Sequence, residues 1–441
     1  NKPGGRLIKN LKDHGYTGKL YVVNQKESEV QGLPCYRSVS ELPPVDLAIL
    51  SIPAVFCPEA MEILARKKET RAFIVISAGF SEMGQEGKEL EKRMADIADS
   101  VEGTLIGPNC IGIMNSFHSS VFTTPIPKFW SGGCDFVSGS GATAVFIMEA
   151  GIPKGLRFSS VWSVGNSAQT GVEEVLAWMD EEYDPEVSPP IKLLYLENIR
   201  NPDKLLYHAT SLIRKGCRIA AIKAGSSVAG SRAASSHTGA MVSSDAAVEA
   251  LFRKAGIVRC YGREELVTAA NVFLCKELKG KKIAIITHAG GPGVMLTDAL
   301  ESGGLKIPVI EDSPAKKALK DMLYPGSSVE NPIDFLATGT VDQLKAIIDA
   351  CEKDFDVDGM AVIFGSNGLV PVREVYQLVD EKRQQCSKPI YPIFPSIIEV
   401  KDEVSLFLSQ GNVNFPDEVL LGRALTKIMN TPGPSEQGML L

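Results

Sequence analysis

The sequence predicts an α/β protein made of three doubly wound units. Short apolar runs alternate with longer amphipathic stretches along all 441 residues. The apolar residues in these runs are continuous, which is typical of strands in a parallel sheet that helices cover on both faces. At roughly 150 residues per domain, the length also allows about three domains.

The first unit ends near residue 125, where "TTPIPKFWSGG" supplies proline, glycine and an edge. Its expected strands are "KLYVVN" (19–24), "DLAILSIP" (46–53), "AFIVISAG" (72–79) and "GTLIGPN" (103–109). The segments 57–68 and 86–100 read as the helices between them.

The second and third units open in the same way. Residues 134–152 and 281–305 each read as a strand, a glycine-rich turn and a helix that ends in glycine followed by Ile or Leu. The second unit ends near residue 275, and the tail 430–441 has the composition of a linker or frayed end. This weak internal repeat, about 150 residues apart, predicts two similar doubly wound domains.

Composition argues against several classes of function. The net charge is -7 without a Lys/Arg cluster, so we expect no nucleic acid partner. No apolar run approaches the roughly 20 residues of a membrane helix. The nine cysteines are scattered without a C-x-x-C pair, which excludes the usual zinc and thioredoxin-like motifs and fits reduced thiols in the cytoplasm.

Two turns could bind phosphate, because each places small residues between a strand and the start of a helix. Free N–H groups and the helix dipole attract anions there. Packing alone explains such turns equally well, and neither matches the P-loop pattern. Their residues are Ser138, Gly139, Ser140 and Gly141 in one turn and Gly290, Gly291 and Gly293 in the other.

His237 is a candidate nucleophile, since its neighbours in "SRAASSHTGAMVSSDA" leave the imidazole accessible. A nucleophilic ring needs a partner on its other nitrogen. Glu197 directly follows an apolar strand, at the carboxyl end where open α/β sheets place their sites. A surface histidine and a solvated carboxylate are the alternatives. His288 is expected to be a turn residue rather than a nucleophile.

The segment "SSHTGAMVSSDAAVEALFRKAGIVRCYGREEL" closely resembles the phosphohistidine segment of the NDP-forming acyl-CoA synthetases, a superfamily that includes succinyl-CoA synthetase and ADP-forming acetyl-CoA synthetase. The resemblance covers essentially the whole chain. Further matching stretches, in order, are "YVVNQKESEVQGLPCYRSVSELPPVDLAILSIPA", "FIVISAGFSEMGQEG", "GPNCIGIMN", "VSGSGATA", "SVGNSAQTGVEEVLAW", "YLENIR" and "AGGPGV".

The resemblance implies a Rossmann-like CoA-binding domain at 1–127. Two flavodoxin-like domains would follow at 128–276, with the phosphohistidine, and at 277–430, before a tail or linker at 431–441. It also implies the reversible reaction of acyl-CoA, NDP and phosphate to carboxylic acid, CoA and NTP, through an acyl phosphate and a phosphohistidine.

Site residues follow from the matching motifs. His237 would carry the phosphoryl group, Glu197 would orient its ring, and both glycine-rich turns, with Ala142, would face the phosphate. Asn109 and Asn166 would line the acyl or phosphate pocket, whereas Cys110 is expected only to pack. The residues expected at CoA are Gly4, Gly5, Asn24, Lys26, Pro53, Ala78 and Gly79.

Two departures from the family limit this interpretation. Its first strand and its CoA turn should precede "NKPGG", and its ATP-grasp portion is absent. We therefore expect ATP or ADP and Mg²⁺ on an ATP-grasp domain or β subunit, and a homo- or hetero-oligomer. No metal ligand is expected in this chain. The acyl group and the choice of nucleotide stay open.

Two other classes of function remain as alternatives. The missing nucleotide domain is compatible with a non-catalytic CoA-binding or regulatory module. A nicotinamide-linked oxidoreductase rests only on the Rossmann-like first unit, and no intact G-x-G-x-x-G is present.

Overall fold

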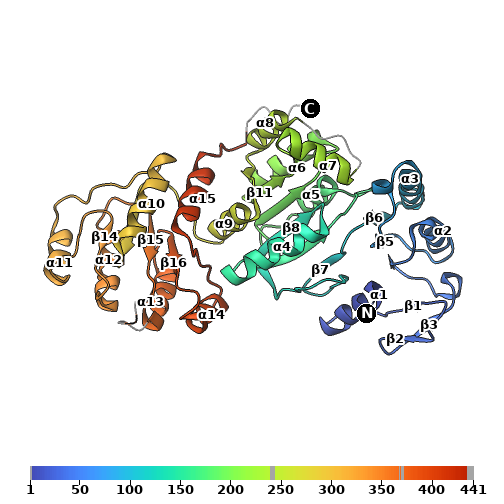
Figure 1. Ribbon diagram of the computed structural model, residues 1–441, viewed down its shortest axis with the longest axis horizontal. Coiled ribbons are helices and arrows are strands. Elements are labelled where there is room, and N and C mark those ends of the chain that lie inside the picture. Colours follow the sequence, from blue (N-terminus) through green and yellow to red (C-terminus); the bar gives the residue numbers. More distant parts are fainter. Residues whose placement is uncertain (1, 239–243, 367, 369–371, 435–441) are drawn as a thin grey trace. The chain divides into compact units, whose positions relative to one another are not determined.

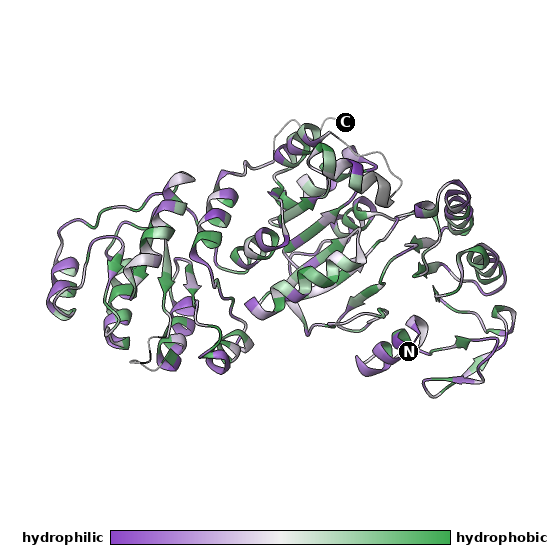
Figure 2. Cartoon of the chain, in the orientation of Figure 1, coloured by the Kyte–Doolittle hydropathy of each residue, from purple (hydrophilic) through white to green (hydrophobic). Residues whose placement is uncertain are grey.

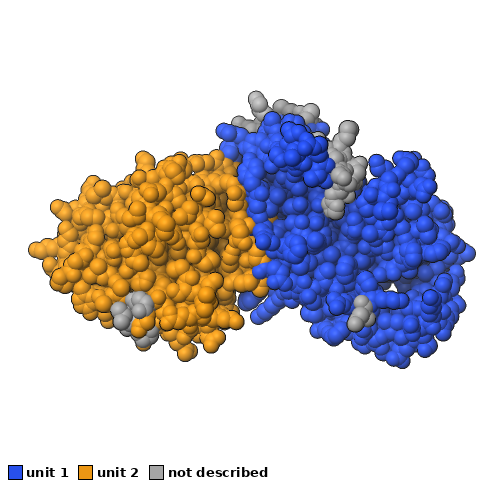
Figure 3. All heavy atoms as spheres, viewed as in Figure 1, with its two compact units in different colours: residues 1–149, 157–263, 432–441 blue, residues 150–156, 264–431 orange. Residues whose placement is uncertain are grey.

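A computed structural model describes residues 2–238, 244–366, 368 and 372–434, with the backbone alone at 234–238. The chain forms two compact units (Figures 1 and 3). Unit 1 comprises Asn1–Glu149, Arg157–Arg263 and Pro432–Leu441, and unit 2 comprises Ala150–Leu156 and Glu264–Thr431.

The first part of unit 1 holds two small sheets. Its helices are α1 (Pro3–Asp13), η1 (Val39–Glu41), η2 (Ala54–Phe56), α2 (Cys57–Lys67), η3 (Ser81–Met83) and α3 (Gln85–Asp99). Its strands are β1 (Val22–Val23), β2 (Glu29–Val30), β3 (Leu33–Tyr36), β4 (Leu47–Leu50), β5 (Ala72–Val75) and β6 (Thr104–Ile106). Strands β4, β5 and β6 form a parallel sheet in that order, as the sequence predicts.

Helices α2 and α3 pack on this sheet through one apolar cluster. Met61 of α2, Phe73 and Val75 of β5, and Met94 of α3 are all at most 1% exposed and belong to it. One local expectation differs from the structure. The predicted strand 19–24 shrinks to Val22–Val23 because it pairs with β3 in a separate sheet of order β1-β3-β2. Gly4 and Gly5 lie in the first turn of α1, where Pro3 supplies a favourable helix start.

The second part of unit 1 is a six-stranded sheet of order β12-β11-β10-β8-β9-β7. Its strands are β7 (Ile113–Asn115), β8 (Phe129–Ser138), β9 (Phe158–Ser163), β10 (Ile191–Leu196), β11 (Arg218–Lys223) and β12 (Val258–Cys260). Its helices are α4 (Gly141–Gly151), α5 (Val172–Glu181), α6 (Pro202–Arg214), α7 (Val228–Thr238) and α8 (Asp245–Ala255). All pairs are parallel except β7 with β9, so the segment after β6 adds an antiparallel edge strand to this sheet.

Unit 2 has a four-stranded parallel sheet of order β14-β13-β15-β16. Its strands are β13 (Ile283–Thr287), β14 (Ile333–Asp334), β15 (Gly359–Ile363) and β16 (Ile390–Ile393). Its helices are η4 (Ile152–Lys154), α9 (Arg263–Phe273), α10 (Gly290–Ser302), α11 (Pro314–Met322), α12 (Val341–Lys353), α13 (Val372–Gln385), α14 (Lys401–Ser409) and α15 (Glu418–Asn430). Every residue of β13 and β15 is buried, as expected for strands covered on both faces.

Figure 2 shows the apolar residues concentrated on the strands and on the inner faces of the helices. In the described part of the chain, no helix is long and apolar enough to cross a bilayer. Because β8, β10 and β11 run parallel, the residues that follow them meet at one edge of the six-stranded sheet. Both predicted glycine-rich turns lie at such carboxyl edges, one in each unit.

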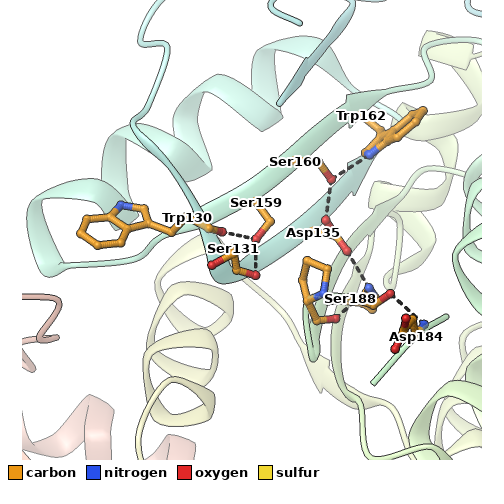
Figure 4. A network of polar contacts seen from close by, with 10 residues as sticks. Trp130, Ser131, Asp135, Ser159, Ser160, Trp162, Asp184 and Ser188 are labelled. Carbon is orange, nitrogen blue, oxygen red and sulfur yellow. Dashed lines mark hydrogen bonds and ion pairs between the residues drawn. The ribbon is translucent and has the colours of Figure 1, made fainter. Parts of the chain in front are cut away.

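A buried polar network lies toward the other end of the strands (Figure 4). Lys192 Nζ donates to Asp135 Oδ2 at 2.5 Å, although the two residues are only 1% and 6% exposed. Ser160 donates to the other carboxylate oxygen, and the Trp162 indole donates to Ser160. A buried charge pair needs such additional partners to offset its desolvation. This network ties β8, β9 and β10 together away from the candidate site.

Candidate functional site

The first turn is fixed by the Ser138 hydroxyl, which is fully buried. It donates to the carbonyl of Ser140 at 2.7 Å and accepts from the Ser140 N–H at 3.2 Å. The Ser140 side chain in turn accepts from the Thr143 N–H at 3.3 Å, which caps the start of α4. The N–H groups of Gly141 and Ala142 have no acceptor in the described part of the chain. The turn therefore offers two unused donors at a helix N-terminus.

Glu197 lies against this turn. The Gly139 N–H donates to the carbonyl of Tyr195 at 2.9 Å, which docks the turn on the end of β10. A Cβ atom at Gly139 would lie 3.6 Å from the Glu197 nitrogen and 3.7 Å from its Cγ. The structure thus brings together two predicted site elements, the glycine-rich turn and the glutamate, from segments about 58 residues apart.

The segment that carries His237 starts from the same edge. The Ala224 N–H, just after β11, donates to the carbonyl of Leu196 at 2.9 Å. Helix α7 then begins at Val228, and its last turn contains His237. The His237 side chain lies outside the described part of the structure, so its distance from Glu197 stays a prediction.

Lys223 is a buried cation at this edge that the sequence reasoning missed. It ends β11, is 5% exposed, and its Nζ donates to the Ala224 carbonyl at 2.6 Å. Burial lowers its pKa and the charge of Arg259 lowers it further, whereas Asp245 and Glu197 act in the opposite direction. A single strand-end lysine has no recognisable motif, which is why only the structure identifies it.

The second turn repeats the construction of the first in unit 2. The Thr287 hydroxyl donates to the carbonyl of Ala289 at 2.7 Å and accepts from the Ala289 N–H at 3.0 Å. Helix α10 begins at the next residue, Gly290, where a Cβ atom would lie 3.4 Å from Asp334 Oδ2. Gly291 has open space around it, and Gly293 packs near Thr287.

His288 occupies this second turn as a structural residue. Its ring stacks on Phe364 with 4.5 Å between centroids, and its Nε2 lies 3.0 Å from the Gly365 carbonyl. Burial lowers the pKa of the imidazole, although the Gly365 contact and the Asp334 charge favour protonation. Nδ1 is buried without a partner in the described structure. These contacts agree with the prediction of a turn residue.

Three of the stretches expected at CoA converge at the ends of β4 and β5. The Ser77 hydroxyl donates to the Ile52 carbonyl, next to Pro53, at 2.5 Å. A Cβ atom at Gly79, which follows Ala78 and has a φ of 108°, would lie 3.2 Å from Cβ of Ala54. One at Gly4 would lie 3.8 Å from Ser51, so the start of α1 also reaches this place, with Gly5 beside β2.

The loop around Lys26 has its own support. The Asn24 side chain accepts from the N–H groups of Lys26 and Glu27 at 3.0 and 3.1 Å. Arg37, which sequence reasoning missed, donates to the carbonyls of Gln25 and Glu27. Lys26 itself is exposed. No hydrogen bond among the described residues joins this loop to Gly79, so its part in a CoA site stays a prediction.

Asn109 and Asn166, both predicted to line the acyl or phosphate pocket, are joined by a hydrogen bond, and their role stays a prediction. Asn109 Nδ2 donates to Asn166 Oδ1 at 3.2 Å. Asn166 Nδ2 in turn lies 2.6 Å from Glu82 Oε2 and 2.7 Å from Glu91 Oε1. The two glutamates were not predicted, because these four residues come from separate segments that only the fold brings together.

Cys110 packs, as expected. The residue is 3% exposed, and its thiol lies 3.4 Å from the carbonyl of Val75. Burial raises its pKa to about 12, so the thiolate needed for nucleophilic attack is not formed at neutral pH. No disulfide joins any two of the nine cysteines, all of which lie in the described part of the chain. Among the described side chains, no group of three or more His, Cys, Asp or Glu could hold a metal ion.

Two family models match the chain. Residues 1–116 match the CoA binding domain, and residues 131–273 match the succinyl-CoA ligase like flavodoxin domain. Between them they include the convergent loops of unit 1, the first glycine-rich turn, Glu197 and His237.

Several proteins are similar along most of their length. The α subunit of acetate–CoA ligase [ADP-forming] II of Pyrococcus furiosus is 34% identical over 399 residues, 89% of this chain and 85% of that protein. Acetate–CoA ligase [ADP-forming] I of Archaeoglobus fulgidus is 32% identical over 96% of this chain, which spans 60% of that longer protein.

Solved structures agree with the sequence relatives. The acetyl-coenzyme A synthetase 1 of Ca. Korarchaeum cryptofilum, described as dinucleotide forming and in complex with phosphate and ADP, superposes with a TM-score of 0.85 at 27% identity, covering 96% of this chain and 91% of that chain. A protein of Pyrococcus horikoshii OT3 gives 0.83 at 29% identity, covering 97% and 94%. On its fold, its motifs and these relatives, the chain belongs to the family of NDP-forming acyl-CoA synthetases, together with the α subunits of ADP-forming acetate–CoA ligases.

Proposed function

We propose that this chain is the part of an acid–CoA ligase (NDP-forming) that interconverts acyl-CoA and acyl phosphate and carries the phosphoryl group on His237. The full reaction is acyl-CoA, NDP and phosphate to carboxylic acid, CoA and NTP. Membership of the family supports the reaction class, and the first turn with Glu197 beside it supports the location.

The first step forms the acyl phosphate. A phosphate oxygen attacks the thioester carbon, the carbon–sulfur bond breaks, and CoA leaves as the thiolate, which takes up a proton. We place CoA on the convergent loops that contain Gly4, Pro53, Ala78 and Gly79. Asn24, Lys26 and Gly5 belong to the same proposed site. Asn109 and Asn166 lie between these loops and the first turn.

The second step moves the phosphoryl group to His237. A ring nitrogen attacks phosphorus, the bond to the acyl oxygen breaks, and the carboxylate leaves. The role of Glu197 is to accept a hydrogen bond from the other ring nitrogen and hold the ring in orientation. The N–H groups of Gly141 and Ala142 and the dipole of α4, about half a positive charge, stabilise the phosphoryl oxygens. Phosphoryl transfer requires mainly such positioning and charge stabilisation.

The last step needs groups outside this chain. We assign nucleotide and Mg²⁺ to an ATP-grasp partner, either a β subunit or a further domain, because similar proteins are named as α subunits. The second turn, with Gly290, Gly291 and Gly293, is a further proposed phosphate contact. The named relatives act on acetate, and we propose a small carboxylic acid here. The nine cysteines, none of which forms a disulfide, support a cytoplasmic enzyme.

The observation that carries the proposal is the contact of Gly139 with Glu197 at the capped start of α4. The test is incubation of the chain with acetyl-CoA and radiolabelled phosphate, followed by measurement of acid-labile label on the protein. We expect label on the parental chain and none on His237→Asn. His14→Asn, at an exposed histidine of the same unit, is the matched control and keeps the label.

Three outcomes are informative. Acid-labile label on His237→Asn would show that another residue carries the phosphoryl group. Loss of label from both variants would point to a general disturbance and contradict the assignment. Tight CoA binding without any labelling, with or without an ATP-grasp partner, would indicate a non-catalytic CoA-binding module instead.

A further inference from the structure

The Asn166 side chain lies between two carboxylates in unit 1. Its Nδ2 lies 2.6 Å from Glu82 Oε2, 2.7 Å from Glu91 Oε1 and 3.2 Å from Ser81 Oγ. Its backbone is fixed as well, since its N–H donates to the Pro108 carbonyl and its own carbonyl accepts from Arg200. Hydrogen bonds therefore fix both the backbone and the side chain of Asn166.

The two carboxylates are both held as acceptors. Glu82 Oε1 accepts from the Gly79 and Phe80 N–H groups, and these contacts together with Asn166 lower the pKa of Glu82 against the effect of burial. Glu91 is 7% exposed and accepts from the Ser81 N–H at 3.1 Å. An ionised carboxylate such as Glu82 offers no hydrogen, so the group of Asn166 that faces Glu82 and the adjacent Glu91 oxygen has to be its NH₂.

The orientation of the Asn166 amide fixes the orientation of the Asn109 amide. Because the NH₂ of Asn166 faces the glutamates, its oxygen Oδ1 faces Asn109. Asn109 therefore has to donate to this oxygen through its own Nδ2. The Asn109 oxygen then faces away from the relay. Asn109 is exposed, and the described part of the chain supplies no hydrogen-bond partner for Oδ1. Its backbone φ of 57° lies in the left-handed region, which asparagine adopts more readily than most residues other than glycine.

Asn109 stands beside both proposed ligand sites of unit 1. Its N–H donates to the carbonyl of Ser77, in the loop assigned to CoA. Two residues further on, Ile111 lies so close to Gly141 of the phosphate turn that a Cβ atom there would be 2.4 Å from its Cγ2. If CoA binds at the loop that contains Ser77 and phosphate binds at the turn that contains Gly141, the pantetheine end of CoA has to reach from the loop to the turn, past Asn109.

We propose that Glu82 and Glu91 are positioning residues that act through Asn166 to present the Asn109 carbonyl oxygen as an acceptor for a hydrogen-bond donor at the pantetheine end of CoA. That end carries two donors, the terminal amide N–H and the thiol. The contact orients the donor and does not remove a proton, because an amide oxygen is too weak a base. The inference rests on the proposed function, since it requires CoA to bind this chain.

The test is titration calorimetry of the full chain with three probes: CoA, desulfo-CoA, which lacks the thiol, and adenosine 3′,5′-bisphosphate, which lacks the pantetheine end. The variants are Asn109→Ala, Glu91→Gln and the double variant. Glu89→Gln is the matched control, because Glu89 is an exposed glutamate of the same helix whose side chain accepts a hydrogen bond from Gln85 and from no other described residue.

We expect Asn109→Ala to weaken CoA about two- to tenfold, the range of one net hydrogen bond, and to leave the bisphosphate unchanged. Glu91→Gln weakens CoA in the same direction, and the double variant binds no worse than Asn109→Ala, because the glutamate acts only through Asn109. Glu89→Gln binds all three probes like the parental chain. Desulfo-CoA identifies the donor: an unchanged affinity in Asn109→Ala assigns the thiol, and an equal loss assigns the amide.

Two results would overturn the relay. One is unchanged CoA affinity in Asn109→Ala, and the other is a Glu91→Gln effect that adds fully to it or weakens the bisphosphate equally. Failure of the parental chain to bind CoA is a separate result, which would reject the proposed function itself.

Discussion

The turns at Ser138 and Thr287 share one construction and differ in what stands beside them. In each, a strand-end hydroxyl donates to the carbonyl two residues later and accepts from the N–H of that same residue. In each, a helix then begins at a glycine. The residue inside the first turn is Gly139, and its counterpart in the second is His288.

The residue inside the turn sets how much space lies next to each turn. Beside Gly139 stands Glu197, whose Cγ would lie 3.7 Å from a Cβ atom at position 139, so the glycine adds no side chain next to it. The imidazole of His288 fills the corresponding place and stacks on Phe364. The backbone arrangement of the turn is thus common to both units, whereas the residue inside the turn differs, and in the proposed function it sets how closely a second reactive group can approach.

The largest expected effect comes from giving the first turn the residue of the second. In Gly139→His, the new Cβ makes ordinary contacts at 3.6 Å, so the fold is kept, but the imidazole takes the room beside Glu197. Because a misplacement of about 1 Å can cost 100-fold, we expect phosphate labelling from acetyl-CoA to slow by about that factor or more. Gly132→His, with open space around it, is the control. Equal rates in both variants would mean that the space at Gly139 is irrelevant.

A second comparison concerns one glycine in the first turn of each helix, Gly141 in α4 and Gly291 in α10. In Gly141→Ala, the Cβ atom would lie 2.4 Å from Ile111, and such overpacking costs about 1–3 kcal/mol. In Gly291→Ala, nothing lies within 4 Å, and alanine gains about 0.5–1 kcal/mol of helix stability. Urea unfolding checks both, since tryptophan fluorescence reports on unit 1, which holds Trp130, Trp162 and Trp178, and hydrogen exchange of β13 reports on unit 2. Effects of equal sign would contradict the comparison.

The shared construction predicts equal losses when the hydroxyls are removed. Ser138→Ala and Thr287→Val each delete the two hydrogen bonds of a fully buried hydroxyl, and we expect each to destabilise its own unit by about 1 kcal/mol. The same two probes measure these losses. A cost confined to one of the two turns would show that the turns are held in different ways.

The smallest effect is a dependence of unit 2 on pH. Burial lowers the pKa of His288, so the native unit binds fewer protons there than the unfolded chain. The stability due to the neutral ring is complete above the ordinary imidazole pKa of about 6.5 and is lost as the pH falls through the folded value. His288→Asn should reduce the loss of hydrogen-exchange protection in β13 between neutral pH and pH 5. If the variant loses as much protection as the parental chain, the loss arises from the protonation of carboxylates and not from His288.

Local patterns predicted the repeating parts of this molecule well. Strands β4, β5 and β6 and helices α2 and α3 were recognisable because continuous apolar runs and amphipathic periods are properties of single segments. The similar openings at 134–152 and 281–305 predicted the two turns. The resemblance to the family led to the prediction that Glu197 orients His237. Family membership, fold class and ligase chemistry were thus accessible from the sequence.

What the sequence could not show depends on contacts between distant segments. Strand β7 pairs with β9 in the second sheet, and the side chains of Glu82 and Glu91 reach Asn109 through Asn166. Both features join residues that are far apart in the sequence and that form no motif. The buried Lys192–Asp135 pair and the strand-end Lys223 are similar cases, because a lysine in the sequence gives no sign of burial. The three domain boundaries and the roles of the site residues remain predictions.

The most direct test is to locate the phosphoryl group after the chain has reacted with acetyl-CoA and labelled phosphate. Digestion with trypsin at alkaline pH releases residues 233–253, with His237 as the only histidine, and residues 283–306, with His288 as the only histidine. We expect the acid-labile label on peptide 233–253, which follows the turn that Gly139 leaves open. Label on peptide 283–306, or on neither peptide while the chain still turns over acetyl-CoA and phosphate, would contradict the account.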